Sequence, residues 1–237
     1  MVDFCVADVV NDQTYGHTNK SGQDGTVDFT FKHQLTKVQF KFKTGTLATG
    51  TTINLVDAKL YNVKTKGTLT ATYAQNASPA VNALGTTTTT WSAQATATTA
   101  VVYDVTLNQQ DPSNSNKLPL STTASTVHNN DIFLMVPQTM VAPTFTTTPN
   151  IPANLSSAAQ YLLVTWEVVT GGVTTTNVKA LYLDQCVTED NGSTQANIDW
   201  EKNNFITYTV TIGPKPIYFT ASVTAWDSEQ NGYFNVN

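Results

Sequence analysis

Histidine and cysteine are the residue types in this 237-residue chain best suited to nucleophilic or metal chemistry. His17, His33 and His128 stand at no metal-ligand spacing from one another or from a cysteine, and no GxSxG or comparable motif supplies a nucleophile. We therefore expect no catalytic residue, no metal and no cofactor, and predict that the chain is not an enzyme. Because His33 is in phase with Phe29 and Phe31, we interpret it as a hydrogen-bonded histidine at the end of a core strand.

The two cysteines, Cys5 and Cys186, lie far apart in the sequence and outside any CxxC motif. Two buried thiols without a disulfide are the simpler interpretation, and a single disulfide is the alternative. Residues 189–191 and 11–12 offer oxygen ligands, but their acids do not recur at every second position as in a calcium loop. We interpret both segments as solvated turns.

Lysine and tryptophan are the other residue types that could bind a ligand. Lys37, Lys41 and Lys43 form a basic row, which suits an anionic ligand or, in the interpretation we favour, protection of an exposed strand from edge-to-edge aggregation. The tryptophans could stack on sugars, but they do not cluster in the sequence, so packing in the core or at a domain end is the default interpretation. They are Trp91, Trp166, Trp200 and Trp226.

Residues 26–44 carry the clearest alternation of apolar and polar side chains in the chain. In the first half Phe29 and Phe31 fall on one face of an expected strand. In the second half Val38, Phe40 and Phe42 fall on one face of a second strand. A helix would scatter these side chains around its circumference. The period of two therefore predicts two strands, each with one buried and one solvated face.

The rest of the chain also indicates strands, separated by polar or proline-containing loops, and no stretch carries an amphipathic helix of three turns. We predict an all-β fold, an antiparallel β-sandwich with long loops. Further strands are expected within residues 2–10, 53–63, 68–73, 91–107, 132–136, 161–169, 173–183, 206–212 and 217–225, with a hairpin turn at 171–172.

We expect residues 26–237 to form one sandwich domain and residues 1–25 to be a strand and linker. That first strand is either the remnant of a preceding N-terminal domain or an edge strand of the main sandwich. The predicted core draws on strands from both ends of the chain. It contains Phe29, Phe31, Val38, Phe40, Phe42, Tyr208, Val210, Phe219 and Val223.

The charge balance argues against a nucleic-acid partner. Charged residues make up only 12% of the chain, the net charge is −5, and all 12 basic residues are lysines. Without the guanidinium group that reads phosphate and guanine, nucleic-acid binding is not expected. The sequence has neither an 18-residue apolar run nor a basic-then-apolar leader, so we expect no membrane-spanning helix and no signal peptide in it.

Five segments, taken in order, resemble the fimbrillin family of Bacteroidales, the Mfa-like and FimA-like pilins of type V pili. Residues 3–7 (DFCVA) resemble its DF.VA segment, and residues 29–38 (FTFKHQLTKV) resemble its F.H.L.kv strand pair. Residues 64–69 (KTKGTL), residues 133–138 (FLMVPQ) and the region 200–226 follow in the family's order. The family's lipoprotein signal, lipidated cysteine and maturation arginine have no counterpart in this sequence, and Cys5 is not that cysteine.

The resemblance implies a transthyretin-like β-sandwich that assembles by strand exchange. Its partners would be other pilin subunits and, for adhesion, a glycan or protein on a host or bacterial surface. Contact with a membrane would be only through an N-terminal lipid anchor that this sequence lacks. The location would be the cell surface, either fimbrial or anchored to the outer membrane.

Two functions are compatible with the resemblance. The leading one is a structural subunit of a cell-surface pilus (fimbria), assembled by donor-strand exchange and supporting adhesion. The alternative is a non-polymerising surface lipoprotein or a tip adhesin that binds carbohydrate or protein. Near the end of the sequence Phe234 and Val236 share one face of an extended strand. They are the candidate donor-strand residues, and an ordinary polar tail is the other interpretation.

Overall fold

The computed structural model describes residues 3–9, 29–74, 85–93, 103–105, 117–126, 132–143, 159–186, 198–213 and 218–225. Regular structure in these ranges is almost entirely strand, which confirms the predicted all-β class. No helix in them is long and apolar enough to cross a membrane. The elements are β1 (Cys5–Ala7), β2 (Phe31–His33), β3 (Thr36–Thr44), β4 (Thr51–Tyr61), β5 (Gly67–Ala74), β6 (Thr86–Ala93), β7 (Tyr103–Asp104), β8 (Leu118–Pro119), β9 (Ser125–Thr126), β10 (Ile132–Met135), β11 (Tyr161–Thr170), β12 (Val173–Tyr182), the 3-10 turn η1 (Leu183–Gln185), β13 (Asn204–Ile212) and β14 (Tyr218–Ala225).

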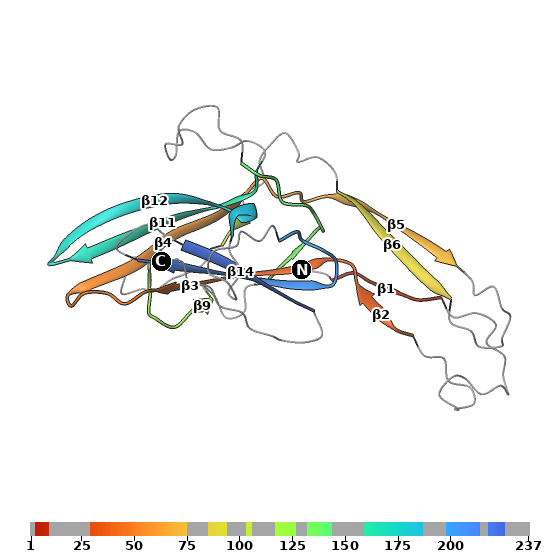
Figure 1. Ribbon diagram of the computed structural model, residues 1–237, viewed down its shortest axis with the longest axis horizontal. Coiled ribbons are helices and arrows are strands. Elements are labelled where there is room, and N and C mark those ends of the chain that lie inside the picture. The colour runs from red at the N-terminus through yellow and green to blue at the C-terminus, as the bar shows by residue number, and fades with distance from the viewer. Residues whose placement is uncertain are drawn as a thin grey trace.

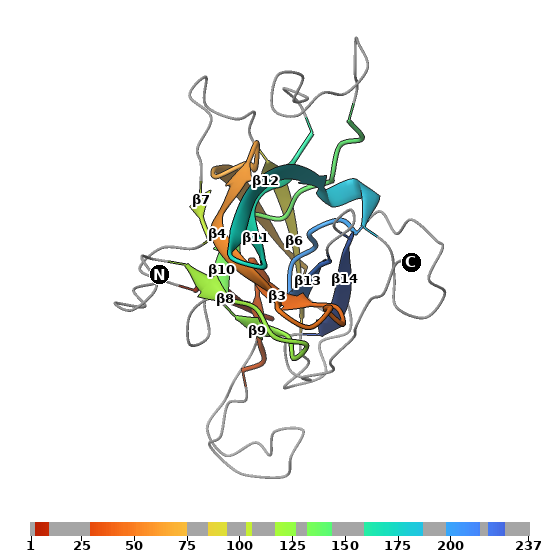
Figure 2. The same ribbon diagram turned by 90° about the vertical axis from the view of Figure 1, so that its left-hand side faces the viewer.

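Two sheets pack face to face as the predicted sandwich, seen end-on in Figure 2. The first has the order β10-β3-β13-β14, and β9 also pairs with β3. The second has the order β12-β11-β4-β7, and β8 also pairs with β4. All described pairs in the sandwich are antiparallel except one, because the central strands β3 and β13 run parallel.

The core lies between the two sheets and is built from alternate positions of their central strands. In β3, Val38, Phe40 and Phe42 are each at most 2% exposed, as the period of two predicts. Tyr208 of β13 stacks on Phe40, with ring centroids 5.3 Å apart and planes 16° apart. The predicted core residues Tyr208 and Val210 are confirmed. The facing sheet contributes Ile53, Leu55, Leu60, Leu162 and Val164.

The hairpin between β11 and β12 turns where the sequence predicts it. Gly171 and Gly172 have φ angles of +58° and +82°, which glycine adopts without the steric cost that a Cβ brings. The hairpin keeps an unbroken register from Thr170 against Val173 to Tyr161 against Tyr182. β11 is thereby fixed between β12 and β4 in the middle of its sheet.

Two smaller sheets, named here the ribbon sheets, extend from one end of the sandwich (Figure 1). One is β1 with β2 and the other is β5 with β6. They meet where the Gly85 N–H donates to the Val9 carbonyl at 2.9 Å and the Thr87 N–H donates to Asp8 Oδ1 at 3.1 Å. A Cβ at Gly85 would lie 2.6 Å from the Ala74 carbonyl oxygen, so this close approach requires glycine.

The predicted placement of Phe29 and Phe31 in the sandwich core is wrong. Phe29 is 55% exposed and Phe31 is 65% exposed. The reason is that β2 pairs with β1 and not with β3, so its apolar face lies on a two-stranded sheet. Alternation in a sequence shows that a strand has an apolar face, but it does not show what covers that face.

Two further predictions need correction at the first sheet. Val223 was expected in the core but is 41% exposed, because β14 is the last described strand of its sheet. The side chain of Phe219 lies outside the described residues. The lysine row does not protect an edge, because β3 lies inside its sheet; instead Lys37 places its Nζ 4.2 Å from the ring centroid of Phe205.

Replacing Phe40 with alanine is expected to lower the free energy of unfolding by about 3–5 kcal/mol, because the truncation leaves a cavity in the core. Phe31→Ala is the matched control, and its exposed ring predicts a loss within about 1 kcal/mol. Urea unfolding followed by tryptophan fluorescence measures both values. Equal losses from the two variants would contradict this description of the core.

Candidate functional site

Several of the residues singled out in the sequence lie outside the described ranges. This holds for the candidate donor-strand residues Phe234 and Val236, for His17 and His128, and for residues 189–191. Within the described ranges, three places can interact with other molecules. They are the sheet edge at β14, a cleft where the ribbon sheets join the sandwich, and a cluster of polar side chains on β1 and β2.

Among the described strands, β14 forms one edge of the first sheet. Among the described strands β14 pairs only with β13. Val223 lies opposite the fully buried Ile206, and cross-strand partners share one face of a sheet, so Val223 points to the core side. Its exposure therefore marks an apolar core-side position that the described residues do not cover. Backbone groups along such an edge, with an apolar position beside them, suit the addition of another strand.

Gln34, between β2 and β3, joins the ribbon sheets to the sandwich and is only 2% exposed. Its Nε2 donates to the Lys32 carbonyl at 2.7 Å, and its Oε1 accepts from the Thr89 hydroxyl at 2.7 Å. Its backbone N–H donates to the Phe4 carbonyl at 2.8 Å, and its own carbonyl accepts from Trp91 Nε1 at 2.6 Å. One buried residue therefore connects β1, β2 and β6 to the start of β3.

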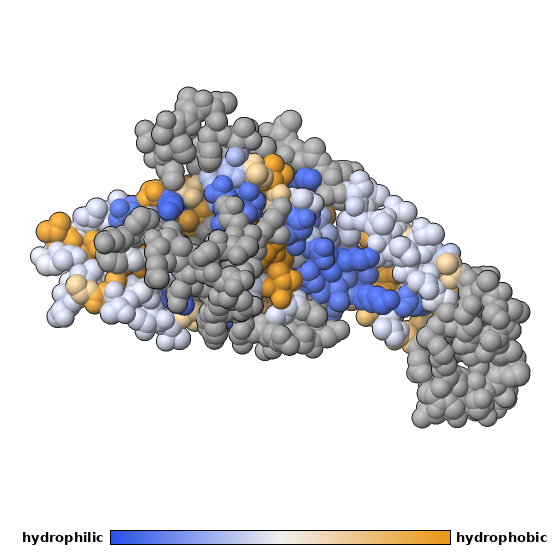
Figure 3. Space-filling model, in the orientation of Figure 1, coloured by the Kyte–Doolittle hydropathy of each residue, from blue (hydrophilic) through white to orange (hydrophobic). Residues whose placement is uncertain are grey.

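A cleft of about 600 Å³ lies beside this junction. Figure 3 shows strongly hydrophilic surface where the ribbon sheets leave the sandwich. The indole of Trp91 packs closely on the backbone there, since a Cβ at Gly67 would lie 3.0 Å from its ring. The lining combines charged, amide, hydroxyl and indole groups from four segments: Lys64, Thr89, Trp91, Pro137, Gln138, Thr139, Asp199, Trp200, Glu201 and Lys202.

Gln138 and Trp200 hold two walls of the cleft together. Their backbone N–H groups donate to each other's carbonyls at 2.8 and 2.9 Å. Gln138 Oε1 also accepts from the Lys64 N–H at 2.8 Å. Trp200 Nε1 donates to the buried hydroxyl of Tyr208 at 3.0 Å, and burial holds the pKa of Tyr208 well above its ordinary value. This tyrosine therefore stays neutral and serves as a structural acceptor.

Two charged groups of the cleft are held in place by hydrogen bonds to neighbouring residues. Lys202 Nζ donates to the Thr89 carbonyl and hydroxyl, both at 2.6 Å, and Asp199 Oδ1 accepts from the Met140 N–H at 2.9 Å. No nucleophile in contact with a general base is found among the described lining residues. Charged and hydroxyl groups beside the Trp91 indole suit a polar, uncharged ligand such as a sugar.

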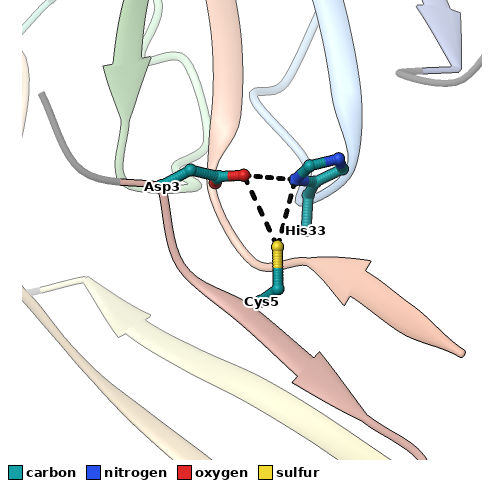
Figure 4. A group of neighbouring side chains, drawn as sticks. All are labelled: Asp3, Cys5 and His33. Carbon is teal, nitrogen blue, oxygen red and sulfur yellow. Dashed lines mark hydrogen bonds and ion pairs between the residues drawn. The ribbon is translucent and has the colours of Figure 1, made fainter. Parts of the chain in front are cut away.

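Asp3, Cys5 and His33 gather on the sheet of β1 and β2 (Figure 4). His33 Nδ1 lies 2.5 Å from Asp3 Oδ2 and 3.3 Å from Cys5 Sγ, and Cys5 Sγ lies 3.5 Å from Asp3 Oδ2. The expected hydrogen-bonded histidine is confirmed, but it sits on a ribbon sheet and not on a core strand. Sequence reasoning missed the cluster because Cys5 and His33 are 28 positions apart and only strand pairing brings them together.

This cluster is not a nucleophilic triad. In a Cys-His-Asp triad the thiol and the carboxylate engage different ring nitrogens, whereas here both face Nδ1. Partial burial, together with Asp3, raises the pKa of Cys5, which disfavours the reactive thiolate. Cys186 is buried, and burial raises its pKa to about 12. The two cysteines are not disulfide-bonded, as the simpler interpretation expected, although Cys5 is exposed and not buried.

A family model described as fimbrillin-like matches residues 2–226, a range that contains every described strand. The chain belongs to the fimbrillin-like family. This fimbrillin-like chain has no match among the curated proteins.

Two of the solved structures that match this chain are fimbrial proteins. A fimbrial protein from Bacteroides vulgatus matches 86% of this chain at 18% identity with a TM-score of 0.50. This chain spans 60% of the length of that protein. The tip fimbrial protein Mfa3 from Porphyromonas gingivalis, with a C-terminal truncation, is matched over 92% of this chain and 70% of its own, at 11% identity and a TM-score of 0.37. The first similarity shows a shared fold.

Gln34→Met keeps the length of the side chain but removes its hydrogen bonds. We expect it to lower the free energy of unfolding by about 1–3 kcal/mol, because the Lys32 carbonyl loses a donor and the Thr89 hydroxyl loses an acceptor. Amide hydrogen exchange should accelerate in β1, β2 and β6 more than in β11. The control is Thr88→Ala, at the exposed neighbour of Thr89. A uniform acceleration across both sandwich sheets would contradict a local role for Gln34.

Proposed function

We propose that this chain is a structural subunit of a cell-surface pilus (fimbria), assembled by donor-strand exchange and supporting adhesion, and that it is not an enzyme. The observation that carries the proposal is the fimbrillin-like match over residues 2–226. Its main partners would be other pilin subunits. Its location would be the cell surface, as part of a fimbria or anchored to the outer membrane.

The open edge at β14 supports the assembly step. A strand from a neighbouring subunit would pair with the backbone of β14 and place alternate side chains on the core side, beside Val223. Phe234 and Val236 have the spacing that such a strand requires. Each such side chain that is fully buried contributes about 1.5–3 kcal/mol, so two of them with a row of backbone bonds would give slow dissociation.

We further propose that residues 26–237 act as one domain in the pilus. β1, which belongs to the strand and linker of residues 1–25, pairs with β2 inside that range. Gln34 then transmits any force on the ribbon sheets to β3 in the middle of the sandwich.

Deleting residues 228–237 from the intact precursor should abolish filaments while leaving the sandwich folded, because the described core strands end at Ala225. A double alanine variant at Phe234 and Val236 should do the same. A double alanine variant at Asn235 and Asn237, which an extended strand would place on the opposite face, is the matched control. Electron microscopy of surface filaments and circular dichroism of the purified subunit give the two readouts. Filaments at wild-type yield from the deletion would refute the donor role.

The role of β14 as the acceptor edge can be tested by introducing a charged side chain on each of its faces. Val223→Lys places an ammonium group on the core side of β14 and should block pairing with a donor strand, whereas Ser222→Lys places it on the outer face of the same strand. Loss of filaments only with Val223→Lys is the expected result. Equal effects from both variants would point to a different acceptor edge.

The cleft beside the junction favours a second candidate, a tip or non-polymerising adhesin that binds carbohydrate or protein. Its charged and hydroxyl groups lie beside an indole face, a combination that suits sugar hydroxyls and the apolar face of a sugar ring. This function does not require the β14 edge, so the two candidates can be separated by independent variants.

Lys64→Met should weaken binding of a bacterial or host glycan by about tenfold or more, because a hydrogen bond from a charged group is worth about 1.5–3 kcal/mol. Lys66→Met, two residues further on and not part of the cleft lining, is the control. A glycan array identifies the ligand, and calorimetry then measures the affinity of both variants. If no glycan binds, or if both variants bind equally, the cleft is not a carbohydrate site.

A further inference from the structure

The positions of Asp3, Cys5 and His33 follow from the pairing of two short strands. Asp3 and Cys5 are two residues apart, so the alternation along an extended chain puts them on one face. Cys5 lies directly opposite His33 in the β1–β2 register, and cross-strand partners share a face. Three side chains of different chemistry therefore project from the same side of the sheet toward one point (Figure 4).

Without a bound ion, these three groups are held together by hydrogen bonds. One ring nitrogen, His33 Nδ1, faces both the thiol of Cys5 and the carboxylate of Asp3. Cys5 Sγ donates to Asp3 Oδ2, so this carboxylate oxygen is the shared hydrogen-bond partner of the thiol and the imidazole. A cation at the centre would instead accept a lone pair from sulfur, nitrogen and oxygen together.

The distances suit a tetrahedral ion. Zinc bonds of about 2.3 Å to sulfur and 2.0–2.2 Å to nitrogen and oxygen place two ligands of a tetrahedron about 3.3–3.6 Å apart. Cys5 Sγ is already 3.3 Å from His33 Nδ1 and 3.5 Å from Asp3 Oδ2. Only the distance between Asp3 Oδ2 and His33 Nδ1, which is 2.5 Å, would have to increase, by about 1 Å. Both side chains are partly exposed, which leaves room for this adjustment.

We propose that Asp3, Cys5 and His33 form a binding site for a divalent transition metal ion of the zinc class, with water in the fourth position. One thiolate, one imidazole and one carboxylate are the ligand types that zinc accepts, while calcium and magnesium prefer oxygen ligands alone. The ion displaces the proton of the Cys5 thiol as it binds. This site is independent of strand exchange and of the cleft.

The role that fits this position is structural. The β1–β2 register contains only three residue pairs, too few to hold a two-stranded sheet in water without further support. A metal bound across the two strands ties β1 to β2 at the end next to Gln34. The ion therefore stabilises the ribbon sheet and has little effect on the sandwich core.

The test uses the full chain, purified without a histidine tag, reduced and freed of metal. Zinc is titrated by calorimetry, and cobalt is titrated in parallel because thiolate coordination to cobalt gives a charge-transfer absorption band. We expect one ion per chain and a thiolate-to-cobalt band. Cys5→Ser should abolish the band, and Asp3→Asn should weaken zinc binding by more than the roughly 10- to 100-fold loss that changes beyond the first ligand shell produce.

Two variants serve as controls. Asp8→Asn changes an acid directly after β1, but Asp8 pairs with Lys32 at 2.8 Å and not with the cluster. Cys186→Ala removes the other thiol, which is buried in the sandwich. Both should bind zinc as the unchanged chain does, and zinc should slow amide exchange in β1 and β2. Absence of a one-to-one complex, a band that survives Cys5→Ser, or equal losses from Asp3→Asn and Asp8→Asn would overturn the proposal. Circular dichroism of each variant verifies that the sandwich is folded.

Discussion

The parallel pairing of β3 with β13 is the constraint on which the rest of the structure depends. The two strands lie side by side in the middle of one sheet, and each buries one face completely in the core. Parallel neighbours cannot be joined by a tight turn and need a long crossover connection. Here the intervening chain supplies the whole second sheet. The stacked rings of Phe40 and Tyr208 lock the register of this pair.

Parallel pairing also determines where the candidate functional surfaces lie. Because β3 and β13 begin at the same end, the segments that precede them meet there, and Thr36 Oγ1 donates to the Glu201 carbonyl across 165 positions of sequence. Gln34, just before β3, attaches the ribbon sheets, and residues 199–202, just before β13, form one wall of the cleft. On the other side of β13 lies β14, whose far side has no partner among the described strands.

Local patterns in the sequence predict most of the long strands but not their partners, and β6 begins before the expected residues 91–107. The alternation in residues 26–44 and 206–212 predicts the buried faces of β3 and β13, and Gly171-Gly172 predicts a hairpin turn. The same alternation misplaced Phe29 and Phe31, because it is identical for a strand in a sandwich and for one in a two-stranded sheet. The cluster of Asp3, Cys5 and His33 had no sequence signal, since its spacing is created by cross-strand pairing.

We propose that the tail of one subunit completes the sheet of the next. A cross-link between two subunits tests this proposal most directly. Two precursors in which Cys5 and Cys186 are replaced, one carrying Val223→Cys and the other Phe234→Cys, are mixed, assembled and oxidised. Donor-strand exchange predicts a disulfide-linked pair containing one copy of each chain, recovered from filaments and identified by mass spectrometry. Filaments that assemble normally but yield no mixed pair would contradict the account.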